Sequence, residues 1–256
     1  MTTTLAVANQ KGGVAKTTTV ASLGAALVEL GQRVLLVDLD PQASLTFSLG
    51  IDPEELPASV HQVLLGDEKV ADVVVGVEDG PDLLPATIDL AATEAQLLTR
   101  TGREHALRLP LEEVAGDYDW VLLDCPPSLG ILTVAALSAA DLVLVPMQAE
   151  TLSHRGVGQL LDTVYDVKRF TNKSLQVLGV LPTQYDGRTQ HARAVLEAVS
   201  TTYDLRVLEP PVPKTIRFAE APAIGRSILA TARRSKGAMA YRDIARVLLS
   251  AGRATG

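Results

Sequence analysis

Residues 5–19 of this 256-residue chain read LAVANQKGGVAKTTT, a short apolar run followed by two glycines and a lysine–threonine pair. A strand, a glycine turn and a helix start in this order expose backbone N–H groups that bind the phosphates of a nucleotide. Gly12 and Gly13 let the backbone approach the anion without a Cβ in the way. We expect Lys16 to reach the β- and γ-phosphates and the Thr17 hydroxyl to bind Mg²⁺. The alternative is a glycine-rich turn with a chance Lys-Thr after it.

The motif departs from the strict P-loop pattern G-x-x-x-x-G-K-[ST], because Gln10 and Ala15 stand where glycines belong. What remains is Lys-Gly-Gly-x-x-Lys-Thr, with an additional lysine, Lys11, ahead of the glycines. This arrangement resembles the deviant Walker A motif of the ParA/MinD family of dimerising ATPases. Many members have glycine where Ala15 stands, so this chain carries one additional methyl group in the loop. The resemblance implies that ATP is held by Lys11, Gly12, Gly13, Val14, Ala15, Lys16, Thr17 and Thr18.

Apolar segments of strand length alternate with helix-length segments along the chain. Strands are expected at Leu5–Ala8, Arg33–Asp38, Leu83–Pro85, Trp120–Asp124, Leu142–Pro146, Val177–Leu181 and Arg206–Leu208. Helices are expected at Thr17–Leu30, Leu90–Thr99, Ile131–Ala139, Arg155–Phe170, Thr189–Tyr203 and Ala238–Ala251. The alternation predicts an α/β protein with a single doubly wound, mainly parallel sheet flanked by helices, of the P-loop NTPase type. We expect one domain over residues 1–256, with short surface helices in residues 52–80.

Composition excludes several classes of protein. No apolar run approaches the roughly 18 residues needed to cross a bilayer, and the first strand begins too early to leave room for a signal peptide. The single cysteine, Cys125, provides neither a disulfide framework nor a metal cluster. We therefore expect a cytoplasmic protein with no membrane partner.

Charge is distributed unevenly along the chain. The net charge is −7, yet residues 1–167 hold 8 basic and 24 acidic side chains, whereas residues 168–256 hold 15 basic and 6 acidic ones. The net of +9 in the second part favours an anionic partner for the carboxyl-terminal third. The alternative is that these cations lie on separate helix faces and pair with acidic neighbours.

A second motif, Asp38-Leu39-Asp40-Pro41-Gln42, stands at the end of the second expected strand. Pro41 ends that strand, so Asp40 can turn towards the nucleotide, where a carboxylate can orient a water molecule or accept its proton. The motif resembles the Walker A′ motif of the same family, whose second aspartate is needed for hydrolysis. The resemblance implies that role for Asp40 and a supporting role beside Mg²⁺ for Asp38. An Asp-Pro pair that merely starts a turn is the alternative.

The third motif is the apolar strand Trp120–Asp124, which ends in one carboxylate. This is the Walker B arrangement, in which the aspartate holds Mg²⁺ directly or through water; the alternative is a strand that ends in a solvated aspartate. The neighbouring Cys125 has no activating base nearby in the sequence, so we interpret it as a small buried hydrophobe.

Lys11 is the least expected residue of the first motif, because Lys16 already supplies a cation for the phosphates. In the family, the leading lysine reaches across a nucleotide-sandwich dimer to the phosphates of the partner subunit. The resemblance therefore implies an ATP-dependent homodimer, with Lys11, Lys16 and Asp40 as the catalytic residues. A solvated surface lysine is the alternative.

From Leu129 onwards the chain is similar to the chromosomal and small-plasmid ParA (Soj) branch, most clearly in residues 142–150, 185–189, 217–222 and 234–241. In this branch the ATP-bound dimer binds double-stranded DNA without sequence preference, and a ParB-like centromere-binding protein stimulates hydrolysis. The resemblance implies a nucleoid-associated ATPase in DNA segregation. The DNA-binding candidates are Arg188 and Arg217, followed by Arg233, Arg234, Lys236, Arg242 and Arg246, for which solvated surface charge is the alternative.

Three other functions share parts of this pattern. A MinD-like membrane-associated ATPase would need a lipid-facing amphipathic carboxyl-terminal helix, and the apolar face of the last expected helix is predicted to pack on the protein instead. An electron-transfer ATPase similar to the nitrogenase iron protein would need cysteines to hold a shared cluster. A metabolic ligase or synthetase of the same fold is the third.

Overall fold

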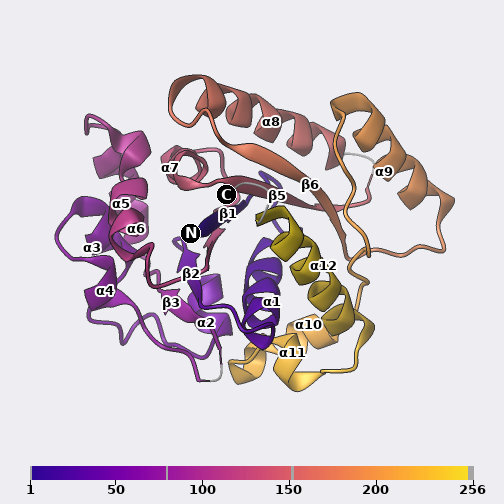
Figure 1. Cartoon of the computed structure of the whole chain (residues 1–256), viewed down its shortest axis with the longest axis horizontal. Helices are drawn as coiled ribbons and strands as arrows, with labels where there is room; N and C mark the ends of the chain where they lie inside the picture. Colours follow the sequence, from indigo (N-terminus) through magenta and orange to yellow (C-terminus); the bar gives the residue numbers. More distant parts are fainter. Residues whose placement is uncertain (1, 79, 151–152, 253–256) are drawn as a thin grey trace.

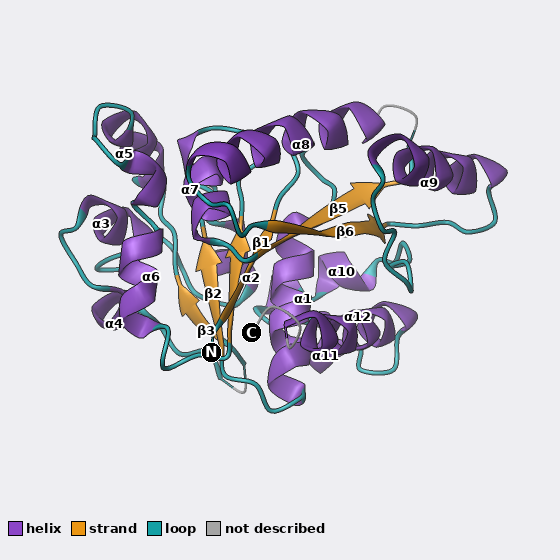
Figure 2. Ribbon diagram, turned by 45° about the horizontal axis from the view of Figure 1, so that its top comes forward, coloured by secondary structure: helices purple, strands orange, loops and turns teal. Residues whose placement is uncertain are grey.

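Six parallel strands form one sheet in the computed structural model, which describes residues 2–78, 80–150 and 153–252. The strand order is β3-β2-β4-β1-β5-β6, so the chain winds outwards from β1 in both directions (Figures 1 and 2). The strands are β1 (Thr3–Val7), β2 (Val34–Asp38), β3 (Asp82–Leu84), β4 (Trp120–Asp124), β5 (Leu142–Gln148) and β6 (Gln176–Thr183). The predicted doubly wound α/β fold is confirmed.

Helices cover both faces of the sheet because successive strand residues point to opposite sides. Leu5 and Val7 of β1 pack in one core cluster with α1 and α12, whereas Ala6 packs in a second cluster with α7 and α8. The longer helices are α1 (Lys16–Glu29), α5 (Leu90–Leu97), α6 (Arg108–Val114), α7 (Ile131–Ala139), α8 (Ser153–Phe170), α9 (Gln190–Tyr203) and α12 (Lys236–Gly252). The shorter ones are α2 (Ser44–Ser48), α3 (Val60–Leu65), α4 (Val70–Val73), α10 (Arg217–Glu220) and α11 (Ile228–Thr231), with the 3₁₀ turns η1 (Arg103–His105) and η2 (Pro222–Ile224).

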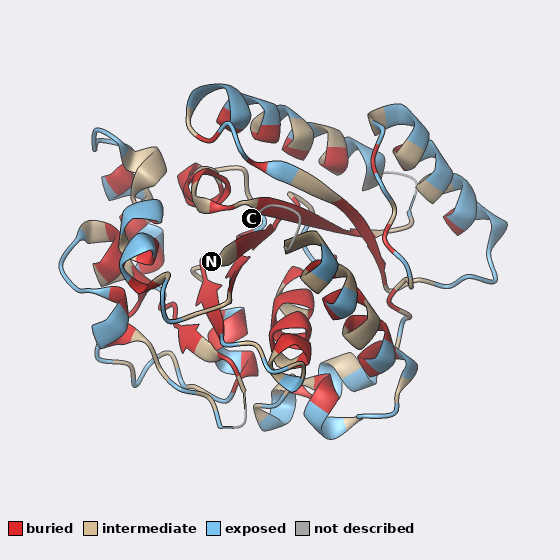
Figure 3. Cartoon of the chain, viewed as in Figure 1, coloured by how far each residue is buried: buried red, intermediate tan, exposed pale blue. Residues whose placement is uncertain are grey.

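The core is aliphatic, in keeping with an aromatic content of only 4%. Eleven of the twelve largest fully buried side chains described are leucines, and the twelfth is Tyr241. Buried residues fill the strands and the inner sides of the helices (Figure 3). None of the described helices combines the length and apolarity that a bilayer-spanning segment requires.

The prediction of one strand is wrong. Arg206–Leu208 contributes only an isolated bridge between Val207 and Val180 of β6. Pro210 and Pro211 follow after Glu209, and a proline has no N–H to continue a ladder. Residues 52–80 contain the short helices α3 and α4, as expected.

Candidate functional site

The turn between β1 and α1 has the backbone shape of an anion-binding loop. Gly13 has φ +75°, and a Cβ built at Gly12 or Gly13 would meet nothing within 4 Å. Ala15 directly precedes α1 and also lies in the left-handed region, with φ 66°. This conformation costs a residue with a Cβ roughly 1 kcal/mol. That cost explains why many members of the family have glycine where this chain has Ala15.

Side chains at the ends of three strands form hydrogen bonds with the backbone of the loop. The Gly13 carbonyl oxygen accepts hydrogen bonds from Gln148 Nε2 (3.0 Å) and Gln184 Nε2 (2.8 Å), and the Val14 carbonyl oxygen accepts one from Thr183 Oγ1 (2.9 Å). Asn9 Oδ1 accepts the Lys11 N–H at 3.0 Å. These residues were missed in the sequence, although they end or closely follow strands whose carboxyl ends meet at one edge of the sheet.

A cavity of about 520 Å³ opens over this loop, within the size range of ligand pockets. It brings together residues of the first and second motifs with residues from the carboxyl-terminal third that were not predicted. The first group is Gly12, Gly13, Ala15, Lys16, Thr17, Thr18 and Asp40. The second group includes Gln184, Lys214, Thr215, Phe218 and Tyr241.

Lys16 lines the cavity, and the buried Asp124 lies close enough for the two charges to act on each other. Lys16 is 8% exposed, and burial lowers its pKa, while the charges of Asp124 and Asp40 oppose that shift. Burial also raises the pKa of Asp124 well above its usual range, and the nearby Asp38 raises it further. The Thr17 hydroxyl and the Lys16 charge act on this pKa in the opposite direction, but among the described residues no donor reaches either carboxylate oxygen of Asp124 in full hydrogen-bond geometry. An unpaired buried carboxylate beside Thr17 and Lys16 is suited to a hard cation such as Mg²⁺, which prefers oxygen ligands.

Asp38 is equally buried, but its carboxylate is occupied by protein donors. Oδ1 accepts the Asp40 N–H (3.1 Å), and Oδ2 accepts both the Thr46 N–H (2.9 Å) and the Thr46 hydroxyl (2.8 Å). Burial raises the pKa of Asp38 to about 6 against the opposing effect of these bonds. Through these hydrogen bonds Asp38 stabilises the Asp40 loop and the start of α2. Its oxygens are therefore less available to a cation than those of Asp124.

Asp40 and Lys11 lie at the rim. Asp40 is half-buried, lines the cavity, and accepts the Gln42 N–H at 3.0 Å. Lys11 forms an ion pair with Glu150 at 2.5 Å, and its side chain is 36% exposed. Both groups can therefore move towards an incoming ligand.

Cys125 follows Asp124 and is buried. Burial and the Asp124 charge raise the pKa of its thiol. A thiol that resists ionisation is a poor nucleophile, which agrees with its interpretation as a small hydrophobe.

Most of the predicted DNA-binding residues have a charged partner within the chain. Arg188 pairs with Asp186 (2.8 Å), and Arg217 pairs with Glu220 (2.8 Å); these pairs are exposed. Arg242 instead bonds both carboxylate oxygens of Glu29 on α1, at 2.5 and 2.8 Å, and its side chain is 21% exposed. Arg246 pairs with Asp243. Arg233, Arg234 and Lys236 are exposed around the α11–α12 connection.

Comparisons with known proteins agree on one family. A family model described as an AAA domain matches residues 2–177. The chain is 41% identical to the sporulation initiation inhibitor protein Soj of Bacillus subtilis, over 97% of this chain and 98% of that protein. It is 40% identical to the chromosome partitioning protein ParA of Caulobacter vibrioides, over 96% and 93%.

A solved structure is similar over almost the same length. The crystal structure of cobyrinic acid a,c-diamide synthase from Mycobacterium smegmatis is 57% identical to this chain, with a TM-score of 0.88 over 97% of this chain and 94% of that one. That protein has been crystallised with ADP and magnesium, and with an ATP analogue and magnesium.

Proposed function

The chain belongs to the Soj/ParA family of chromosome-partitioning proteins, and from this premise we propose that it is an Mg²⁺-dependent ATPase acting in DNA segregation. Its ATP-bound form is a homodimer that binds double-stranded DNA without sequence preference. The observation that carries the proposal is the cavity over the glycine loop, which Lys16 and Asp40 line, together with the buried carboxylate of Asp124, whose charge acts on Lys16. We further propose that the 256 residues work as one domain.

Each residue of the site has a role that follows from its place. The N–H groups of the loop and of the first turn of α1 bind phosphate oxygens, and Lys16 neutralises them from within the same chain. Asp124 and Thr17 would hold Mg²⁺, which when bound offsets charge on the phosphate oxygens. Asp40 orients a water molecule or accepts its proton. Lys11 exchanges Glu150 for the phosphates of the partner subunit.

The DNA-binding surface is proposed from the basic carboxyl-terminal third, with Arg188 and Arg217 as its leading residues and Arg233, Arg234 and Lys236 beside them. Arg242 is better suited to holding α12 on α1, because Glu29 occupies its guanidinium. Hydrolysis, stimulated by a ParB-like centromere-binding partner and by DNA, returns the dimer to the form that leaves DNA. The protein is then cytoplasmic and associated with the nucleoid.

Two other functions are weighed against specific observations. The 57% identity to a protein named cobyrinic acid a,c-diamide synthase favours an ATP-dependent amide synthase, yet releasing ammonia from glutamine by covalent catalysis takes an activated cysteine, and Cys125 is buried with a raised thiol pKa. A MinD-like membrane helix requires a free apolar face. Ile244 and Leu248 of α12 are fully buried in the core.

One experiment separates these possibilities. Gel filtration and DNA retention are measured with no nucleotide, ADP or ATP plus Mg²⁺ for the wild type, Lys16→Ala, Asp40→Ala and Arg217→Glu. We expect Lys16→Ala to stay monomeric, Asp40→Ala to dimerise and keep DNA without turnover, and Arg217→Glu to dimerise without DNA. A wild type that stays monomeric with ATP overturns the proposal. Binding to vesicles but not DNA favours the membrane ATPase, and amidation of cobyrinic acid with ammonium favours the synthase.

A further inference from the structure

Helix α2 and the segment that carries Arg217 meet through two glycines. Gly50 ends the turn after α2 with φ +84°, and Gly225 ends η2 with φ +65°. A Cβ on Gly225 would lie 2.6 Å from Gly50 Cα and 3.0 Å from Gly50 N, and a Cβ on Gly50 would lie 3.3 Å from Gly225 Cα. The two backbones therefore lie so close that a Cβ on Gly225 has no room and a Cβ on Gly50 has little.

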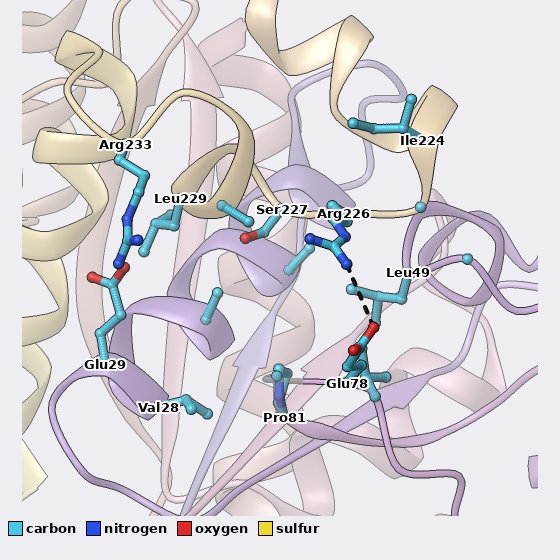
Figure 4. A pocket seen from close by; sticks show the side chains of 17 residues that line it. Val28, Glu29, Leu49, Glu78, Pro81, Ile224, Arg226, Ser227, Leu229 and Arg233 are labelled. Carbon is cyan, nitrogen blue, oxygen red and sulfur yellow. Dashed lines mark hydrogen bonds and ion pairs between the residues drawn. The ribbon is translucent and has the colours of Figure 1, made fainter.

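Space lies on both sides of this contact. A cavity of about 330 Å³ separates α2 from the α10–η2 turn and is lined by Phe47, Phe218 and Pro222. A larger cavity of about 650 Å³ lies on the other side, between α1 and the η2–α11 turn (Figure 4). At the edge of the larger cavity, Arg226 pairs with Glu78 at 3.4 Å, a long and exposed ion pair. The Gly50–Gly225 contact therefore joins α2 to the η2 turn between the two cavities.

The same segment reaches the nucleotide cavity through its other side. Phe218, which directly follows Arg217, lines that cavity and packs edge-on against Tyr241, with ring centroids 5.8 Å apart. A Cβ on Gly237 would lie 2.7 Å from the Phe218 ring, so the ring fits closely at the start of α12. Residues 217–225 are therefore bounded by the nucleotide cavity at one end and by Gly50 at the other.

The opposite side of the contact also leads to the nucleotide. Asp38 ties α2 to the loop that carries Asp40, through Thr46 and the Asp40 N–H. Helix α2 therefore connects this loop to Gly50, which lies two residues beyond the end of α2. Two routes from the cavity, through Phe218 and through α2, therefore converge on residues 217–225.

We propose that the Gly50–Gly225 contact is the support that positions the α10–η2 segment, so that nucleotide in the cavity fixes the placement of Arg217. The inference rests on the proposed function for the role of Arg217 in binding DNA. It adds that the two glycines are positioning residues for a segment that contacts the nucleotide through Phe218 and the DNA through Arg217. The added methyl in Gly225→Ala forces the segment away from α2, while the phosphate loop is unchanged.

The test compares three glycine variants. Gly225→Ala brings the closest approach to the opposite backbone, and Gly50→Ala brings a milder one that serves if the first variant fails to fold. Gly66→Ala is the matched control, because Gly66 also has a positive φ (+79°) but a Cβ there would meet nothing within 4 Å. All three carry the same kind of backbone strain, and only the first two disturb the contact.

Hydrogen exchange of residues 217–225 and ATP-dependent DNA retention are the two readouts, with gel filtration as the check on dimerisation. With Mg²⁺ and a non-hydrolysable ATP analogue, exchange in this segment should slow by about tenfold in the wild type and in Gly66→Ala, and by less than about twofold in Gly225→Ala. Gly225→Ala should still dimerise with the analogue yet bind DNA at least about tenfold more weakly. Gly50→Ala should fall between.

Two results would overturn the inference: no nucleotide-dependent protection of residues 217–225 in the wild type, or protection and DNA binding in Gly225→Ala equal to those of Gly66→Ala. A wild type that does not bind DNA with ATP defeats the proposed function instead. In that case the exchange measurement, which needs no DNA, still decides whether the glycine contact positions the segment.

Discussion

The carboxylates of Asp38 and Asp124 show how a residue type acquires its role from its neighbours. Both stand at strand ends, and β2 and β4 pair them directly across the sheet. Asp38 accepts N–H and hydroxyl hydrogen bonds on both oxygens, whereas among the described residues no donor reaches Asp124 in full hydrogen-bond geometry. The first therefore stabilises a loop, and the second stores an unfavourable charge that a cation can neutralise. Sequence alone could place both at the site but could not show that Asp38 is already occupied, because two of its three donor groups belong to Thr46, in a helix that was not predicted.

Asp124→Asn is expected to stabilise the nucleotide-free protein by about 1–3 kcal/mol at pH 7, because it removes an unpaired buried charge. Burial raises the folded-state pKa of Asp124 above its ordinary value of 3.8. Such a carboxyl favours folding fully below the unfolded pKa, and this contribution is lost as pH rises through the folded pKa. The gain from Asp124→Asn should therefore be small near pH 4 and grow with pH.

Urea unfolding at several pH values measures this gain, with the exposed Asp72→Asn of α4 as the control. The same Asp124→Asn variant should fail to dimerise with ATP and Mg²⁺. A variant less stable than the wild type at pH 7 would show that Asp124 has a stabilising partner in the free protein.

Some helices and strands are defined by their local sequence, whereas others form only because of contacts with the rest of the fold. The limits of β4 and α7 match the prediction, because an apolar run and a glycine before the helix define them locally. Helix α2 has five residues, too few to be stable alone, and its N-cap residue provides no side-chain hydrogen bond. Asp38 accepts the N–H of its third residue instead. This support comes from another strand, and no local pattern in the sequence reveals it.

Thr46→Val is expected to slow ATP turnover by about tenfold with little change in KM. The substitution keeps the side-chain shape but removes the hydroxyl that donates to Asp38 and accepts the Ala86 N–H. Asp40 then loses its fixed approach to the nucleotide while the phosphate loop is intact. Thr46→Ser keeps the hydroxyl and should restore kcat. Steady-state kinetics would contradict the prediction if Thr46→Val raised KM and left kcat unchanged.

Over the whole molecule, an acidic protein carries its DNA-binding candidates on one part of the chain. The net charge of −7 repels DNA at long range, so binding must depend on local contacts by the cations of residues 168–256. Arg188 and Arg217 already have carboxylate partners in the free chain. The partners are exposed and exchange readily, since such pairs contribute little. The charge asymmetry was readable from the sequence, but this pairing was not, because it depends on rotamers and on turns.

DNA affinity of the ATP-bound dimer should therefore fall steeply with salt. If Arg188 and Arg217 each neutralise one phosphate in both protomers, the slope of log K against log salt should be about −3 to −4, and Arg217→Ala should reduce its magnitude by about 2. Fluorescence anisotropy with labelled duplexes of unrelated sequence measures the slope. A slope near zero, or one that differs between sequences, would argue for recognition of bases rather than of the phosphate backbone.

The buried thiol of Cys125 has a practical consequence for measuring conformational changes of this protein by site-specific labelling. It is the single cysteine of the chain and is shielded from reagents, so a cysteine introduced at an exposed position such as Ile224 would be the one thiol open to a maleimide dye. The native chain is in this sense already a cysteine-free background for site-specific labelling. A probe at that position could report the timing of the conformational cycle without any change to the phosphate loop.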